Sequence, residues 1–582
     1  MAQINNKLTY PQPATAAPIQ RQQPYHLGVS QPVSDKEPNE FELKRTDLLE
    51  ECLRDFNLFE TQEEMHLRQR VLSDVNKLSQ KWIRKLSLDK RMPKEIAEGC
   101  QAKIFTFGSY RLGVHNRGAD IDTLLVAPKH IERDDFFDSF QTALSEMEGV
   151  EYVRAVRNAF VPVIKTKISG IELDILFSTL NSRTIPNDQK LGDTNLLKGL
   201  DQQSIRSLNG CRVTDEILAL VPNHESFKLA LRAIKLWAKR RGIYSNVLGY
   251  LGGVSWAILT ARTCQLYPRA TAATIVEKLF FVFSNWEWPK PVLLVNLCDN
   301  DLGLQVWDPR TNPADKYHMM PIITPSYPQQ NSTFNVTRST RQIIIDQFVQ
   351  AKEVTGEIIK GNKTWDAFFE PIDFFGLYKF FLVLRVSNQP EWMSLVESKI
   401  RVLVQNLEQH SVINLVHTYP KAYDPPNSDD NYVTWCIGLQ FTQKKCDINL
   451  THEVNSFKTT SMYPSQDHPT SHGCNLFRPH DYQQNRPCLH RRSLAIFYLP
   501  YVVIIMLQFR GRVSAPVSMF SHYFERCAYN NVEKQAMHCA RALDQTSPSA
   551  TKLLNIFLYI YLYSIFLISF FPLTSIPLLQ TK

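Results

Sequence analysis

Three aspartates on two short apolar segments constrain this chain more than any other feature of its sequence. Asp120 and Asp122 stand one residue apart, and strand residues at that spacing point to the same face. Asp174 lies in a segment, 170–177, where apolar and acidic residues alternate strictly. If the two strands pair, three carboxylates meet at one point and repel each other unless a cation is bound. The pattern therefore predicts a sheet that builds a divalent-cation site.

A Gly-Ser pair, Gly108-Ser109, precedes this site by eleven residues. Mg²⁺ favours carboxylate oxygens, and two such ions can hold the attacking and leaving oxygens of a phosphoryl transfer. A turn at the pair would offer backbone N–H groups to a phosphate, and a helix beginning there would add its positive end. The plainer role for Ser109 is a helix N-cap. A lone D-x-D pattern more often marks a solvated strand edge. Whether these aspartates form a catalytic site therefore depends on the remaining motifs.

Longer motifs carry a resemblance to one family. FGSYR (107–111) followed by GADID (118–122) resembles the signature of eukaryotic nuclear poly(A) polymerase, within the nucleotidyltransferase superfamily that includes DNA polymerase beta. The resemblance continues in order through SLNGCRVTD (207–215), AIKLWAKR (233–240), IYSN (243–246), LGGVSW (251–256) and ITPSYPQQN (323–331). It covers about residues 25–460. It implies a multidomain α/β and α+β protein: a nucleotidyltransferase palm, a helical central domain and an RNA-recognition-like C-terminal domain.

The resemblance also implies a role for each matching residue. Asp120 and Asp122 would hold two Mg²⁺ ions, for which Mn²⁺ could substitute, and Asp174 would hold the catalytic ion and help to take the proton from the RNA 3′-hydroxyl. The implied ATP contacts are Phe107, Gly108, Ser109, Asn116, Asp120, Ile121, Asp122, Asp174, Asn209, Lys235, Tyr244, Gly253, Val254 and Thr324. The implied RNA contacts are Phe160, Lys165, Asn335 and Arg401.

The implied reaction is template-independent transfer of adenylate from ATP to the 3′ end of mRNA precursors, with release of pyrophosphate. Adenine would be selected by a pocket made of Asn209, Lys235, Thr324 and Val254, because a wrong base leaves polar groups unpaired. The implied partners are RNA, ATP and the cleavage and polyadenylation machinery, for a monomeric nuclear protein without a membrane role.

Plainer roles exist for several of these residues. Lys235 could be a solvated helix residue, Tyr244 a core aromatic, and the glycines before Val254 a place of close helix packing. Phe160, Lys165 and Asn335 could equally be a core, a surface and a turn residue. Arg401 could pair with Glu397 on its own helix.

Composition agrees with an intracellular protein of three or four domains, given 582 residues and a net charge of +8 that suits a polyanionic partner. The eleven cysteines contain no C-x-x-C pair, which indicates reduced thiols. No apolar core is visible in residues 1–24, so no secretory signal peptide is expected.

We expect five regions. Residues 1–38, rich in Pro, Gln, Ser and Asn, are predicted to be a disordered tail. Residues 39–214 form the predicted catalytic domain, 215–364 the central domain, and 365–460 an incomplete RNA-recognition-like domain. The patterns predict helices over 39–86, 134–147, 225–241, 255–266 and 392–406, and strands over 103–107, 121–127, two within 151–177 and 432–441.

Residues 461–582 change character abruptly. The stretch 494–509 is apolar apart from Gln508, and 553–579 is uncharged and long enough to span a bilayer. A membrane anchor is one interpretation; we favour translated intron or untranslated sequence, foreign to the fold. Two other functions therefore stay open: a compromised or mislocalised RNA-binding isoform, with a foreign or membrane-tethered C-terminus, and a nucleotidyltransferase that adds uridylate or CCA ends.

Overall fold

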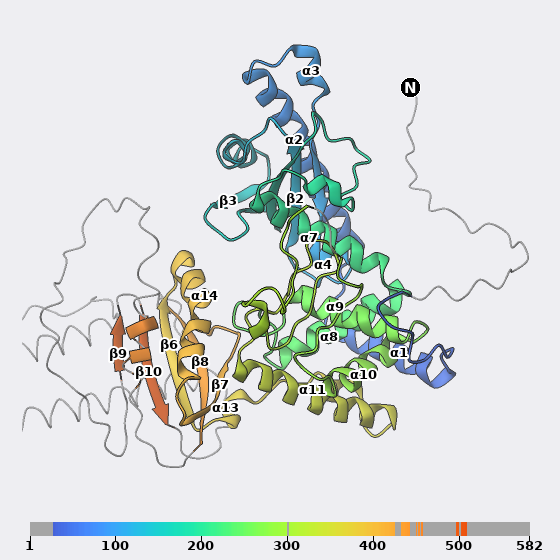
Figure 1. Cartoon of the computed structure of the whole chain (residues 1–582), viewed down its shortest axis with the longest axis vertical. Helices are drawn as coiled ribbons and strands as arrows, with labels where there is room; N and C mark the ends of the chain where they lie inside the picture. Colours follow the sequence, from blue (N-terminus) through green and yellow to red (C-terminus); the bar gives the residue numbers. More distant parts are fainter. Residues whose placement is uncertain are drawn as a thin grey trace, which may run out of the picture.

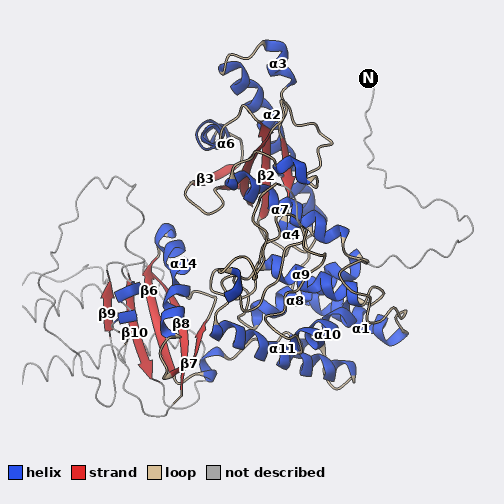
Figure 2. Ribbon diagram, viewed as in Figure 1, coloured by secondary structure: helices blue, strands red, loops and turns tan. Residues whose placement is uncertain are grey.

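The computed structural model describes residues 27–298, 302–424, 432–442, 450, 452–453, 455–457, 496–499 and 502–508. Two five-stranded sheets lie apart from one another, and a helical region adjoins both (Figure 1). Figure 2 shows that the strands are confined to these two sheets. The molecule is thus α/β at its N-terminal end, helical in its centre and α+β at its C-terminal end.

The predicted helical run over 39–86 is two helices, α1 (Glu40–Asp55) and α2 (Gln62–Asp89). Asn57 takes a left-handed φ of 52°, which ends the first helix. Thr61 caps the start of the second helix with a capping box. Its hydroxyl accepts from the Glu64 N–H at 3.3 Å, and the Glu64 carboxylate accepts from the Thr61 N–H at 2.9 Å. Figure 1 shows α2 lying along the first sheet.

The first sheet has the order β1-β2-β5-β4-β3, in which only β2 and β5 are parallel. Leu173, Ile175 and Phe177 of β5 are buried, as their alternation predicts, and they pack in one core with Val75 and Ile83 of α2. The strands are β1 (Lys103–Thr106), β2 (Ile121–Pro128), β3 (Val150–Val156), β4 (Val163–Ile168) and β5 (Ile171–Leu180). The predicted helix over 134–147 is interrupted by a π-helical turn, giving α5 (Arg133–Asp135), a π-helix (Phe136–Phe140) and α6 (Gln141–Ser145).

The helical region consists of α7 (Gln202–Ala219), α8 (His224–Arg240), α9 (Gly253–Leu266), α10 (Ala272–Ser284) and α11 (Arg338–Ile359). All side chains of α9 from Ser255 to Leu266 are buried, so this helix is its centre. Trp237, Trp256, Phe280 and Phe348 pack edge to face around it. Short elements complete the fold: α3 (Lys94–Gly99), α4 (Gly108–Arg111), α12 (Trp365–Phe368), α13 (Phe374–Leu377) and 3₁₀ turns at Thr194–Leu197 and Asp315–Tyr317.

The second sheet has the order β7-β8-β6-β10-β9, with α14 (Pro390–Leu407) packed against it. Its strands are β6 (Phe380–Ser387), β7 (Ile413–Thr418), β8 (Tyr432–Phe441), β9 (Ile496–Leu499) and β10 (Val502–Gln508). β10 pairs with β6 over its whole length, from Val502 opposite Val386 to Gln508 opposite Phe380. Part of the C-terminal stretch that we interpreted as foreign to the fold therefore completes this sheet. Its uncharged, β-branched residues favour a strand, and that strand pairs with the backbone N–H and C=O groups at the edge of β6.

The predicted disordered tail is too long. Residues 27–38 lie along the helical region, where the Val33 N–H donates to the Leu266 carbonyl at 2.8 Å. Arg269 forms ion pairs with both Asp35 and Glu37. Composition could not reveal these partners because they lie more than 230 positions away in the chain. No helix in the part of the chain that the structure describes is long and apolar enough to cross a membrane; residues 553–579 lie outside it.

Candidate active site

The predicted carboxylates meet through the register of two parallel strands. Asp122 of β2 stands directly opposite Asp174 of β5. Asp120 precedes β2, since the strand begins at Ile121, and its side chain is exposed while Ile121 is fully buried. Burial, followed by the charges of Asp120 and Asp174, raises the pKa of Asp122 to about 7. The three carboxylates therefore act on one another electrostatically, as the sequence predicts.

Lys165 of β4 lies opposite Asp174 and forms an ion pair with its Oδ2. Among the described residues, no group of three or more His, Cys, Asp or Glu side chains is already arranged to hold a metal ion. The donor chemistry nevertheless fits a hard divalent cation, because Asp122 is disfavoured as an anion by its two neighbours and a cation removes that cost. Asp174 would have to exchange some of its contact with Lys165 for the ion.

A tight turn approaches the carboxylates closely. Gly108 has a φ of +60°, and a Cβ there would stand 2.2 Å from Asp122 Oδ2, so only glycine fits. The turn is fixed by the Phe107 N–H, which donates to the Asp122 carbonyl at 3.0 Å, and by the Gly108 N–H, which donates to the Thr214 hydroxyl at 3.2 Å. The helix that follows, α4, is a single turn. Our expectation of a helix dipole at Ser109 is therefore wrong, as is the N-cap role, since Phe107 is the cap residue.

Lys235 is buried rather than solvated, with 6% of its surface exposed. Its ammonium donates to the Val114 carbonyl at 3.0 Å. Burial, and then Lys239 and Arg232, lower its pKa to about 8, while Asp122 and Asp120 act in the opposite direction. A buried cation beside the carboxylates is suited to an anionic ligand such as a triphosphate.

Tyr244 also faces this site. Burial, with added effects of Asp122 and Asp120, raises the pKa of its phenol to about 12, so the hydroxyl keeps its proton and can donate. The hydroxyl oxygen is 2.9 Å from where a Cβ would stand on Gly253, the first residue of α9. Val254 follows it and is 39% exposed, at the open end of that helix. A Cβ on Gly253 would therefore crowd the Tyr244 hydroxyl, which agrees with the close packing that we considered for this glycine.

Three predicted nucleotide contacts remain. Asn116 and Asn209 each bury a side-chain Oδ1 that has no hydrogen-bond partner within the protein. An unsatisfied buried acceptor costs free energy, which a ligand donor would recover. Thr324 is held on a separate segment, where its hydroxyl accepts from the Gln330 N–H at 3.0 Å.

The predicted RNA contacts form two separate groups. Phe160 is 71% exposed, and the Arg206 guanidinium stands 3.8 Å over its ring, while Lys165 pairs with Asp174. Asn335 and Arg401 are hydrogen-bonded to each other across the central region and α14. In the part of the chain that the structure describes, Arg401 bonds Asn335, and no ion pair joins it to Glu397, so the plainer role that we considered for it is not realised.

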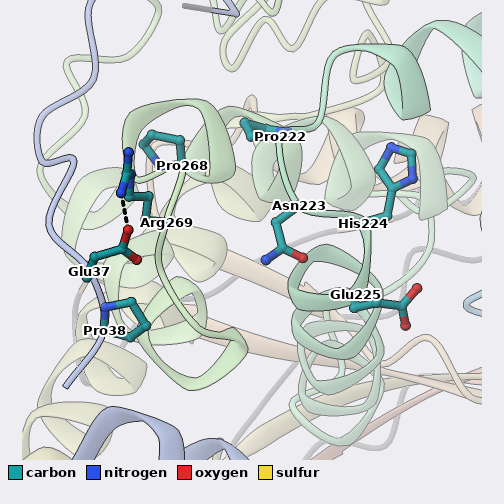
Figure 3. A pocket seen from close by; sticks show the side chains of 8 residues that line it. All are labelled: Glu37, Pro38, Pro222, Asn223, His224, Glu225, Pro268 and Arg269. Atoms are coloured by element: carbon teal, nitrogen blue, oxygen red, sulfur yellow. Dashed lines mark hydrogen bonds and ion pairs between the residues drawn. The ribbon is translucent and has the colours of Figure 1, made fainter. Parts of the chain in front are cut away.

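A surface hollow lies away from these residues. Figure 3 shows a surface hollow of about 610 Å³ lined by Glu37, Pro38, Pro222, Asn223, His224, Glu225, Pro268 and Arg269. Its lining includes none of the predicted site residues, and Arg269 is already held by Glu37. We therefore assign no part of the site to it.

Two residues that organise this region have no recognisable local signal. The Tyr250 hydroxyl, on the loop before α9, donates to the Thr418 carbonyl of β7 at 2.8 Å. Arg212 of α7 is buried and donates to carbonyls of distant segments. A buried aromatic or a helical arginine is ordinary in sequence, and only the fold shows what each one joins.

Comparison with known proteins places three family domains along the chain in order. Residues 28–221 match the poly(A) polymerase nucleotidyltransferase domain, 226–371 the poly(A) polymerase central domain, and 373–432 the poly(A) polymerase predicted RNA binding domain. These matches agree with the mixed sheet, the helical centre and the C-terminal sheet. They confirm the fold class that the motifs imply.

Individual relatives agree. The chain is 44% identical over 452 residues to a poly(A) polymerase of Dictyostelium discoideum, covering 75% of this chain and 56% of the relative. It is 42% identical over 494 residues to nuclear poly(A) polymerase 1 of Arabidopsis thaliana, covering 81% and 66%. The matches thus span less than two thirds of these two relatives. Poly(A) polymerase pla1 of Schizosaccharomyces pombe is 44% identical over 402 residues, covering 68% of this chain and 71% of that protein. With three successive domains and a relative matched over most of its length, this chain belongs to the poly(A) polymerase family.

Proposed function

We propose that this protein is a template-independent polynucleotide adenylyltransferase that extends RNA 3′ ends from ATP. The register that sets Asp122 opposite Asp174, with a buried Lys235 that acts electrostatically on Asp122, is the observation that carries the proposal. It supplies carboxylates for a cation and an ammonium for a triphosphate in one place. We extend the proposal to mRNA precursors because the family resemblance implies them, and to the nucleus because one relative is named a nuclear poly(A) polymerase.

Asp120, Asp122 and Asp174 would hold two divalent cations, which supply charge neutralisation at the α-phosphate and lower the pKa of the 3′-hydroxyl. Lys235 and the Tyr244 hydroxyl donate to triphosphate oxygens from the other side. The backbone N–H of Ser109 would offer a further donor to the same phosphates, since that of Gly108 is already bound to Thr214. These groups hold the α-phosphate in line for attack and bind the departing pyrophosphate.

Proton removal falls to Asp174. Its carboxylate is held in place by the ion pair with Lys165. It accepts the proton of the primer 3′-hydroxyl as the new P–O bond forms and the bond to pyrophosphate breaks. The nucleophile is the RNA, so no protein side chain forms a covalent bond.

The adenine would lie among Asn209, Thr324 and Val254. The buried Asn209 Oδ1 lacks a partner within the protein and is suited to accept from the exocyclic amine of adenine. Primer RNA would stack on Phe160 and contact Asn335 and Arg401, because exposed aromatics and arginines bind single strands without sequence preference.

The test is extension of a labelled oligoadenylate primer with each of the four nucleoside triphosphates in Mg²⁺. We expect a ladder with ATP and at most traces with the others. Preferential use of UTP, or a single round of C and A addition, would favour the other nucleotidyltransferases. Primer binding without any extension would favour the inactive RNA-binding isoform.

A further inference from the structure

Arg212 is a nearly fully buried arginine of α7, with 4% of its surface exposed, that reaches two segments outside its own helix. Nη1 donates to the carbonyls of Leu191 and Asp193 at 2.7 and 3.0 Å. Nη2 donates to the Thr194 hydroxyl at 3.3 Å and to the Tyr327 carbonyl at 3.2 Å. Burying a guanidinium is costly unless its donors are satisfied. Here the four contacts satisfy Nη1 and Nη2, while the buried Nε has no partner within the described structure.

The Tyr327 carbonyl belongs to the loop that carries Thr324. The Thr324 N–H donates to the Gln330 carbonyl at 3.0 Å, and the Gln330 N–H donates to the Thr324 hydroxyl at 3.0 Å. These bonds join the two ends of the loop. The Tyr327 ring is buried in the same apolar cluster as Leu208 and Cys211 of α7. Arg212 therefore anchors the whole loop against α7.

Asn209 stands on the same helix, three residues before Arg212, and so on a neighbouring position of one helix face. Its Oδ1 is buried and unpartnered. The helix is pressed against the catalytic turn, since a Cβ on Gly210 would lie 2.9 Å from the Phe107 ring. The guanidinium thus connects the segment that presents Asn209 with the segment that presents Thr324.

We propose that Arg212 is a positioning residue for base selection, which sets the spacing between Asn209 and Thr324. The inference rests on the proposed function, because it takes the adenine pocket from it. Discrimination between bases requires the polar groups of Asn209 and Thr324 to reach the edge of one base. If the loop that carries Thr324 is displaced, the two groups no longer fit that edge together. Arg212 need not touch the nucleotide, so its loss should affect nucleotide choice more than turnover.

The experiment compares Arg212→Met with Arg262→Met in the full chain. Arg262 is a matched control, since it is 5% exposed and donates to Gln265 at 3.0 Å and to Ser30, outside the pocket. For each protein, kcat/KM is measured with ATP and with each other nucleoside triphosphate. We expect the preference for ATP to fall about tenfold in Arg212→Met, mainly through a raised ATP KM, and to stay unchanged in Arg262→Met.

Selectivity is a ratio measured within one preparation, so a partly unfolded fraction cancels from it. Arg212→Lys is the second variant; it keeps the charge but cannot reach both outer segments, and an intermediate loss of preference is expected. Unchanged preference in both Arg212 variants, or an equal loss in Arg262→Met, would overturn the inference. A wild-type protein that shows no preference for ATP would instead refute the proposed function.

Discussion

At the scale of single residues, the three aspartates differ although they share one end of a sheet. Asp120 is exposed, Asp122 is half-buried between its two neighbours, and Asp174 is bound to Lys165. Asp122 is therefore the carboxylate whose charge the protein itself tolerates least. It is the one that a bound cation would stabilise most.

Asp122→Asn should lower adenylate addition by at least about a thousandfold, because the carboxylate contact to the cation is lost. Without divalent cation the variant should unfold at the same or a higher urea concentration than wild type, since a buried repulsion is removed. Mg²⁺ should stabilise wild type and not the variant. Glu172→Gln, two residues from Asp174 on the same strand face but exposed, is the control. Near-wild-type turnover of Asp122→Asn would remove it from the site.

Lys235→Ala should raise the ATP KM about tenfold or more, with little change in primer affinity, because a buried charged donor to the triphosphate is lost. Lys228→Ala on the same helix removes a lysine that pairs with Glu225 and should change neither quantity. Steady-state kinetics at varied ATP and primer concentrations distinguish the two. A loss of primer affinity with unchanged ATP KM would place α8 on the RNA side.

At the scale of elements, the second sheet depends on strand pairs far apart in sequence. β10 covers the edge of β6, and β7 meets the helical region through Tyr250 and Thr418. Next to that contact, His417 is fully buried and its Nδ1 is 2.7 Å from the Tyr378 hydroxyl. Burial lowers the pKa of His417 to about 3.

The pairing of β10 with the edge of β6 predicts what happens when the chain is shortened so that β10 is lost. A chain ending at residue 460 should be less soluble, with a raised RNA KM, than one ending at residue 512, because it exposes the unpaired edge of β6. Both chains should keep kcat for adenylate addition, since the first sheet is unchanged. Sedimentation and primer-extension kinetics are the measurements. Equal solubility and equal RNA KM of the two chains would show that β10 is foreign to the fold.

The buried His417 predicts a loss of stability in acid. Its folded pKa lies below the unfolded value of about 6.5, so its contribution is present above that pH and is lost as pH falls toward the folded value. The free energy of unfolding should fall by up to about 1.4 kcal/mol per pH unit from this group. Urea denaturation at about pH 7 and about pH 5.5 should show a smaller difference in His417→Gln. The exposed His66→Gln should match wild type.

At the scale of the whole molecule, the polar contact between Arg401 and Asn335 joins α14 to the central region. Arg401 Nη1 donates to Asn335 Oδ1, and the Asn335 amide donates to the Asn246 carbonyl at 3.0 Å, two residues after Tyr244. The C-terminal part of the protein is thereby connected to the segment of Tyr244, on the side where we propose that the nucleotide binds. A primer that contacts Arg401 would be held in register with the triphosphate.

Arg401→Ala should weaken primer binding and leave the ATP KM nearly unchanged. The slope of log affinity against log salt should fall by about 0.7 if one phosphate contact on a single strand is lost. Lys399→Ala removes the same charge two residues away on α14 and serves as the control. Binding titrations at four salt concentrations suffice, and an unchanged slope would restrict Arg401 to its bond with Asn335.

The sequence by itself determined the features that depend on local periods and motifs. Alternation over 171–177 placed Leu173, Ile175 and Phe177 in the core and Asp174 on the other face, because a strand has a period of two. The family motifs named the aspartates and the domain order for the same reason: the information lies within a few neighbouring residues. Helix interruptions at Asn57 and Phe136 were missed, since backbone strain and π-turns have weak local signals.

Only the tertiary structure decided which distant groups meet. The fold buries Lys235 against Val114, 121 positions away, and joins Arg212 to Tyr327 across 115 positions. It also brings Arg401 to Asn335, 66 positions away, instead of to Glu397 on its own helix. It also pairs β10 with β6, so that a stretch that we predicted to be foreign to the fold supplies two strands of the second sheet, β10 and β9. Such contacts follow from the packing of whole elements, which brings together residues that no local pattern relates.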